Sequence, residues 1–365
     1  MAGAPTTGRS TRTVARWVEV HRLAVAGGEA GVARDVGHRV GRVWLARSRF
    51  ADVVRVAEQT LSLGPDAGAF YDLGWARQRT GFPVEALAAF EQALRLYRAD
   101  RHRGNEAATL SNIGAVYANL GDGRRALEFY ERALPILREV GDRAGEAATL
   151  SNIGLVYGEL GDGRRALEFY ERVLPVQREV GDRAGEATTL NNIGAVYASL
   201  GDGRRALDYY QQALPILQKV GDRAGEATTL NNIGLVYANL GDGRRALDCF
   251  EQALPIRREV GDRAGEATTL NNIAGIRYEE GDLVGAKDIM DRVLELIRAV
   301  GDLRSEAKIT FNIAVLLLQM QRADDAIACQ RRAVDLAVRT EHPELGQMRE
   351  FLTQLEHMVK DEGVR

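Results

Sequence analysis

The sequence predicts an all-α fold built from stacked helix pairs, and three observations carry that prediction. The first is an exact internal period of 40 residues, the second is a helical spacing of apolar residues inside each period, and the third is the lack of any alternating β-branched stretch. A period of this length is typical of a stack of structural units that each contact mainly their neighbours. No β-sheet is therefore expected.

Two heptapeptides mark the period. GDGRRAL begins at Gly121, Gly161, Gly201 and Gly241, and GDRAGEA begins at Gly141, Gly181, Gly221 and Gly261. The repeats 184–223 and 224–263 differ at only eight positions. Such close identity predicts units of the same structure, so that one repeat can be analysed for all of them.

Each repeat is expected to hold two helices. In repeat 104–143 apolar residues recur every three or four positions in both halves, with Gly121 and Asp122 between the halves. Gly121 suits the left-handed residue that ends a helix, and Asp122 suits the N-cap of the next one. Four prolines fall inside the expected second helices, where we expect each to bend its helix: Pro135, Pro175, Pro215 and Pro255.

The pattern of large and small residues resembles that of the tetratricopeptide repeat. The matching residues in the first regular unit are Leu110, Ile113, Gly114, Tyr117, Ala126, Tyr130 and Ala133. The usual repeat has about 34 residues, so these units resemble the longer form found in kinesin light chains, animal cell-polarity adaptors and bacterial sensor proteins. The resemblance implies a right-handed superhelical solenoid whose first helices line a concave groove.

The resemblance and the repeat boundaries together predict three parts of the chain. Residues 1–32 are expected to form an N-terminal helical cap or join, 33–341 a solenoid, and 342–365 a C-terminal capping helix and tail. The solenoid would hold about eight antiparallel helix pairs: 33–65, 66–103, 104–143, 144–183, 184–223, 224–263, 264–303 and 304–341.

A row of asparagines is the main candidate site for ligand binding. The resemblance implies that the residue two before the signature glycine projects into the groove, and in six units this residue is Asn112, Asn152, Asn192, Asn232, Asn272 or Asn312. A second asparagine precedes it at Asn191, Asn231 and Asn271. A carboxamide both donates and accepts hydrogen bonds, so a row of them can hold a peptide backbone of any sequence. The alternative, compatible with the first, is that these side chains bond to neighbouring helices.

The middle of the expected groove is small and neutral. The residue after the signature glycine is Ala115, Leu155, Ala195, Leu235, Gly275 or Val315. This region lacks the lysines and arginines with which some chaperone-binding members of the family hold a C-terminal carboxylate. We therefore do not expect that class of ligand in the middle units.

The N-terminal end of the expected groove is basic and aromatic. Residues 1–60 carry ten arginines and five acidic residues. By alignment, the groove positions here are Arg39, Arg42, Tyr71, Asp72, Trp75 and Arg79. Aromatic side chains with arginines are typical of binding hot spots, which suit an acidic and apolar partner segment. Alternatively, Trp75 packs as core beneath the N-terminal helices.

The sequence gives no indication of an enzyme. No nucleophile–base cluster, phosphate-binding loop or metal-ligand spacing is present, so no catalytic residue, metal or cofactor is expected. GDGRRA matches the residue pattern of a dinucleotide-binding fingerprint, but that motif must follow a strand and no strand is expected here. A net charge of −3 gives no reason for nucleic-acid binding, and no apolar run is long enough to span a membrane.

These observations favour a non-enzymatic scaffold that holds a protein or peptide segment in its groove. The 44 arginines against four lysines and the two cysteines suggest a bacterial, cytoplasmic protein, with a sensor arm of a signalling system as one role. The alternative is a structural assembly component that self-associates through its ends or outer face, because near-identical repeats make end-to-end stacking easy.

Overall fold

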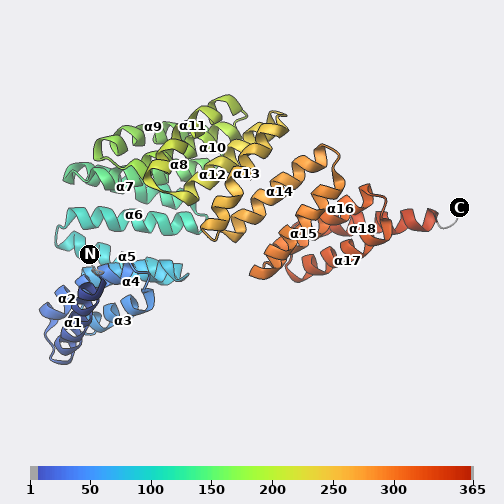
Figure 1. Ribbon diagram of the computed structural model, residues 1–365. Coiled ribbons are helices and arrows are strands. Elements are labelled where there is room, and N and C mark those ends of the chain that lie inside the picture. Colours follow the sequence, from blue (N-terminus) through green and yellow to red (C-terminus); the bar gives the residue numbers. More distant parts are fainter. Residues whose placement is uncertain (1–6, 363–365) are drawn as a thin grey trace, which may run out of the picture. The chain divides into compact units, whose positions relative to one another are not determined.

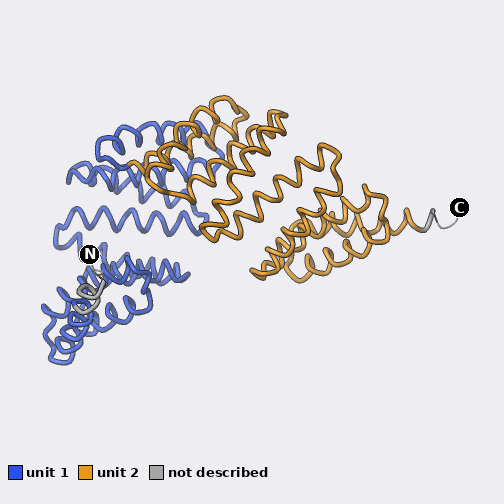
Figure 2. Tube along the Cα trace, in the orientation of Figure 1, with its two compact units in different colours: residues 1–182 blue, residues 183–365 orange. Residues whose placement is uncertain are grey.

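The computed structural model describes residues 7–362, and in this range the chain forms eighteen α-helices and no strand (Figure 1). The all-α prediction is therefore confirmed. The chain divides into two compact units, residues 1–182 and 183–365 (Figure 2). No helix of the described part is both long and apolar enough to span a membrane.

Unit 1 holds nine helices, and consecutive helices pack on each other. They are α1 (Thr7–Ala26), α2 (Ala30–Leu45), α3 (Phe50–Leu61), α4 (Ala67–Arg79), α5 (Pro83–Ala99), α6 (Arg103–Asn119), α7 (Gly123–Val140), α8 (Arg143–Glu159) and α9 (Gly163–Val180). The most extensive packing joins α4 to α5, α6 to α7 and α8 to α9. These are the first and second helices of successive repeats.

Unit 2 continues the same pattern with nine further helices. They are α10 (Arg183–Ser199), α11 (Gly203–Val220), α12 (Arg223–Asn239), α13 (Gly243–Glu259), α14 (Arg263–Glu279), α15 (Leu283–Val300), α16 (Leu303–Gln319), α17 (Ala323–Arg339) and α18 (Leu345–Glu362). Here α10 pairs with α11, α12 with α13, α14 with α15 and α16 with α17, while α18 packs on α17.

The helix boundaries follow the predicted glycine and aspartate signals. Gly121 has a φ of 77°, in the left-handed region that favours glycine, and the Asp122 carboxylate accepts a hydrogen bond from the Arg125 backbone N–H. The same geometry recurs at Gly141 and Asp142. Each helix with an internal proline continues through it as one element. The bend expected at each proline stays a prediction.

The two helices of a pair approach closely because one side carries glycine. A Cβ atom placed at Gly114 would lie 2.7 Å from a ring carbon of Tyr130, and one placed at Gly234 would lie 2.5 Å from a ring carbon of Phe250. Both rings are almost fully buried. In these pairs an aromatic side chain therefore occupies the space beside the glycine and forms part of the core.

Buried glutamates join consecutive pairs. Glu146 is buried in the first turn of α8, and its carboxylate accepts hydrogen bonds from Arg138, with the Nε atom at 2.6 Å, and from Arg143. Burial raises the pKa of Glu146, but the hydrogen bonds and charges of the two arginines outweigh it, so the net pKa is lowered. Glu146 therefore takes part in an ion pair between helices α7 and α8.

Candidate binding site

The six asparagines of the first row lie on the first helices of their pairs. Two of these helices, α6 and α8, belong to unit 1, and four, α10, α12, α14 and α16, belong to unit 2. All six side chains are half-buried. They therefore belong neither to the core nor to the fully solvated surface, and their hydrogen bonds decide what each can do.

Two of the six are held by internal hydrogen bonds. The Asn112 Nδ2 atom donates to the Tyr71 hydroxyl at 2.8 Å, and the Asn272 Nδ2 atom donates to the Asn231 Oδ1 atom at 3.1 Å. Within residues 7–362 the other four side chains make no hydrogen bond: Asn152, Asn192, Asn232 and Asn312. These four carboxamides keep their donors and acceptors for water or for an external partner.

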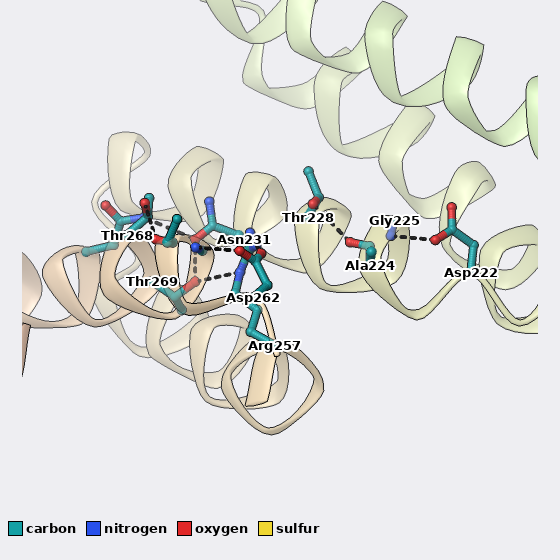
Figure 3. Close-up of polar contacts among 12 residues, drawn as sticks. Asp222, Ala224, Gly225, Thr228, Asn231, Arg257, Asp262, Thr268 and Thr269 are labelled. Atoms are coloured by element: carbon teal, nitrogen blue, oxygen red, sulfur yellow. Dashed lines mark hydrogen bonds and ion pairs between the residues drawn. The ribbon is translucent and has the colours of Figure 1, made fainter. Parts of the chain in front are cut away.

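Two asparagines of the second row, Asn191 and Asn231, connect neighbouring repeats. The Thr229 hydroxyl donates to Asn191 Oδ1 at 3.3 Å, and the Thr269 hydroxyl donates to Asn231 Oδ1 at 3.2 Å (Figure 3). Asn231 is only 5% exposed and accepts two hydrogen bonds, so its carbonyl oxygen has no capacity for a ligand. The expectation that Asn231 contacts a ligand is not supported by this geometry, because its side chain holds α12 to α14 instead.

Exposed leucines accompany the free asparagines. Leu155 is 47% exposed and lies three residues after Asn152, and Leu235 is 39% exposed and lies three residues after Asn232. Residues three apart share one face of a helix. In each of these two helices an exposed leucine therefore adjoins a carboxamide without an internal hydrogen bond. The description of this region as small and neutral does not show this pairing.

A basic hollow lies near the N-terminus of unit 1. It measures about 780 Å³ and is lined by residues of α1 and α2 and the turn that follows: Trp17, Asp35, His38, Arg39, Arg42, Val43, Ala46 and Arg47. The structure thus brings the predicted residues Arg39 and Arg42 together with Trp17. Arg39 forms an ion pair with Asp35 at 3.0 Å, whereas no ion pair engages Arg42 within the described residues.

Asp72 is buried and lies against His38, one of the residues that line this hollow. The residue is 4% exposed, and its Oδ2 atom lies 3.5 Å from His38 Nδ1. The hydrogen bond to Asp72 raises the pKa of His38, while burial raises the pKa of Asp72. A Cβ atom at Gly41 would lie 2.6 Å from Asp72 Oδ2, so the carboxylate fits only because residue 41 is glycine. Asp72 therefore positions His38.

The other aromatic candidates belong to the core. Trp75 packs against the apolar cluster of α4–α7, and Arg79 stacks on its ring at 5.4 Å from the centroid. Tyr71 packs edge-on against Phe90 and accepts the hydrogen bond from Asn112. Trp75 is half-buried, and it packs on this cluster rather than beneath the N-terminal helices, whose apolar cluster does not include it. Sequence reasoning missed Trp17, because only the packing of α1 on α2 brings it beside the arginines.

A comparison with models of protein families shows the family of this chain. The model of the tetratricopeptide repeat matches residues 105–179, 185–259 and 265–339, which is more than half of the chain. The chain belongs to the tetratricopeptide repeat family, as its motif predicted. A search of curated protein sequences finds no match.

Solved structures with the same fold include two that are described as sensors. The chain is similar to a signal transduction ATPase with a tetratricopeptide repeat sensor from Pyrococcus horikoshii (TM-score 0.68, 15% identity, 89% of this chain and 50% of that one). It is also similar to the apo quorum sensor NprR from B. thuringiensis (TM-score 0.63, 16% identity, 91% and 99%). BtubC from P. vanneervenii has a TM-score of 0.51 and 26% identity over 60% of this chain and 92% of its own. The chain spans about half the length of the Pyrococcus ATPase.

Proposed function

We propose that this protein is a non-enzymatic scaffold that binds an extended peptide segment of a partner along the first helices of its repeats. The observation that carries the proposal is the set of free, half-buried carboxamides next to exposed leucines. Asn152 with Leu155 provides one such pair, and Asn232 with Leu235 provides another. An extended peptide offers both main-chain hydrogen-bonding groups and apolar side chains, which suit these two kinds of contact.

The site is expected to favour backbone recognition over strict sequence selection. A carboxamide binds a peptide N–H and C=O without regard to the side chain between them. Selectivity would then come from the few apolar contacts and from charge. Arg42, which is exposed in the basic hollow, would favour an acidic residue of a partner bound to unit 1.

We further infer a role in ligand sensing for a signalling system. One similar structure is a Rap protein complexed with competence and sporulation factor (TM-score 0.55, 14% identity, 96% of this chain and 99% of that one), and NprR is described as a quorum sensor. These likenesses support the fold alone. The inference adds to them the free carboxamides of this chain, which are suited to a peptide signal.

A peptide array tests the proposal in unit 2. The double variant Asn192→Ala/Asn232→Ala should lose at least about tenfold in affinity for peptides that the unchanged protein captures, because two sets of hydrogen bonds to the backbone disappear. Circular dichroism checks that helicity is kept. Binding undiminished in a fully helical variant would refute the role of the carboxamides.

A matched control removes two amides elsewhere on the same repeats. Gln212 and Gln252 are exposed on α11 and α13, and each donates only to a backbone carbonyl of its own helix. Gln212→Ala/Gln252→Ala should leave peptide capture unchanged. A loss equal to that of the asparagine variant would show that capture is unspecific.

A further inference from the structure

A cavity of about 300 Å³ lies within unit 2 between α14, α15 and α16. Its apolar wall comes chiefly from Val293, Leu296 and Ile309, and polar groups of Arg263, Asn271 and Lys308 also line it. This volume is at the lower end of what ligand sites in proteins enclose. The cavity is therefore large enough for a small organic molecule.

The preceding repeat closes the corresponding space with an arginine. Arg257, on α13, is 8% exposed, donates from Nε to the Thr269 hydroxyl at 3.1 Å, and forms an ion pair with Asp262 (Figure 3). The residue 40 positions after Arg257 is Ile297, which carries no polar group and lines the cavity. Replacement of a guanidinium by a shorter apolar side chain leaves space there.

Two further interactions between repeats, an ion pair and a hydrogen bond, are absent at the cavity. Arg223 pairs with Glu259 at 2.9 Å, but the position equivalent to Glu259 is Ala299, and within the described residues Arg263 has no ion-pair partner. The position equivalent to Thr269 is Ile309, so the Asn271 carboxamide lacks the hydrogen bond that Asn231 receives. The Asn271 Oδ1 atom is buried without any partner.

Two cations, Arg263 and Lys308, and one carboxylate, Asp302, line the cavity. Lys308 is paired with Glu344. The Asp302 carboxylate accepts hydrogen bonds from the Ser305 side chain and from the backbone of Ser305 and Arg304, which lowers its pKa and keeps it ionised. Of the two cations that line the cavity, Arg263 is thus the one without an ion-pair partner within the described residues. A ligand carboxylate would supply the partner that Glu259 provides to Arg223 one repeat earlier.

We propose that this cavity binds a small organic carboxylate with an apolar body. The carboxylate pairs with Arg263 and accepts a hydrogen bond from the Asn271 Nδ2 atom, which no internal hydrogen bond engages within the described residues. The unpartnered Oδ1 atom of Asn271 is itself an acceptor and does not bond to the carboxylate. The apolar body lies against Val293, Leu296 and Ile309. This site is separate from the row of free asparagines proposed to bind a peptide.

Calorimetric titration with 4-phenylbutyrate tests the site, because this compound combines a carboxylate with an apolar body. For a ligand of this size we expect a Kd between about 0.1 and 1 mM. The uncharged amide analogue, 4-phenylbutanamide, should bind about tenfold more weakly, since it cannot form the ion pair with Arg263.

Three variants locate the binding. Arg263→Gln should weaken 4-phenylbutyrate binding about tenfold, and Ala264→Trp, at an exposed position in the cavity lining, should block it. The control Arg223→Gln, which changes the equivalent arginine one repeat earlier, should leave the affinity unchanged. Circular dichroism of each variant confirms that the helices remain.

The outcomes are distinct. No heat of binding at about 10 mM 4-phenylbutyrate, equal affinity for acid and amide, or equal losses in Arg263→Gln and Arg223→Gln would each overturn the proposal. The variant Asn192→Ala/Asn232→Ala should still bind 4-phenylbutyrate. Failure of the peptide proposal would therefore not imply failure of this one.

Discussion

The repeats 224–263 and 264–303 have similar sequences but meet the following repeat differently. The first is tied to its successor by Asn231 and Arg257, which both bond to Thr269. The second meets its successor with Ile297 and Ile309 at the equivalent positions and leaves a cavity. A few substitutions can therefore turn a junction that is closed by hydrogen bonds into one that contains a cavity, while the helices stay the same.

The largest expected effect concerns the core inside each pair. Phe250→Ala should destabilise the protein by about 3–5 kcal/mol, because the buried ring fills the space beside Gly234. Met290→Ala, at the equivalent position, should cost about 2 kcal/mol, since the side chain is smaller and Ala274 replaces the glycine. Urea unfolding followed by circular dichroism measures both. Equal losses would show that the two pairs are packed alike.

The next largest effect is expected at the hydrogen bonds of Thr269 across the closed junction. Thr269→Val should cost about 1–3 kcal/mol, because Asn231 and Arg257 both lose a buried hydrogen-bond partner. The matched change Ile309→Val removes one methylene group and should cost about 1 kcal/mol. The same urea experiment compares them. A smaller loss of stability for Thr269→Val than for Ile309→Val would contradict a stabilising role of these hydrogen bonds.

Filling the open junction should have the opposite sign from filling the closed one. Ala267 lines the cavity, so Ala267→Leu should stabilise the protein by about 0.5–2 kcal/mol. Ala227, its equivalent, is fully buried against Ala253 and Ile256, so Ala227→Leu should destabilise by about 1–3 kcal/mol. Melting temperatures of the two variants give the signs directly. Two changes of the same sign would contradict the difference in packing.

The smallest expected effect comes from the surface arginines. Arg223→Gln should cost about 1 kcal/mol, because it breaks the exposed ion pair with Glu259 and the ion pair with the buried Glu226, whereas Arg263→Gln should cost almost nothing. The difference should shrink at high ionic strength because salt screens exposed ion pairs. Urea unfolding at low and high salt tests this, and a salt-independent difference would mean that the arginines act through packing instead.

Much of the fold was predictable because its causes are local. The helix ends depend on Gly121 and Asp122, and the close approach of paired helices depends on Gly114 beside Tyr130. Each of these signals lies within one repeat and recurs at the same position. The family and the all-α class follow from them.

The candidate site was predictable only in part. The asparagine rows were evident from the repeat, but their uses differ: Asn231 is bonded to two neighbours, whereas the Asn232 side chain makes no hydrogen bond within the described residues. Neither Trp17 beside Arg42 nor the burial of Asp72 is evident in the spacing of residues. These features depend on which helix faces meet.

The helical repeat, the helix caps and the close contact between paired helices can be predicted from residue order, because periodicity, glycine geometry and N-cap chemistry act over a few residues. Which carboxamides bond to neighbouring repeats, and which junction has a cavity, is known only from the packing of the helices. The physical reason is that these contacts join residues about one repeat apart, such as Asn231 and Thr269, and the free space depends on whether every partner across the junction is present.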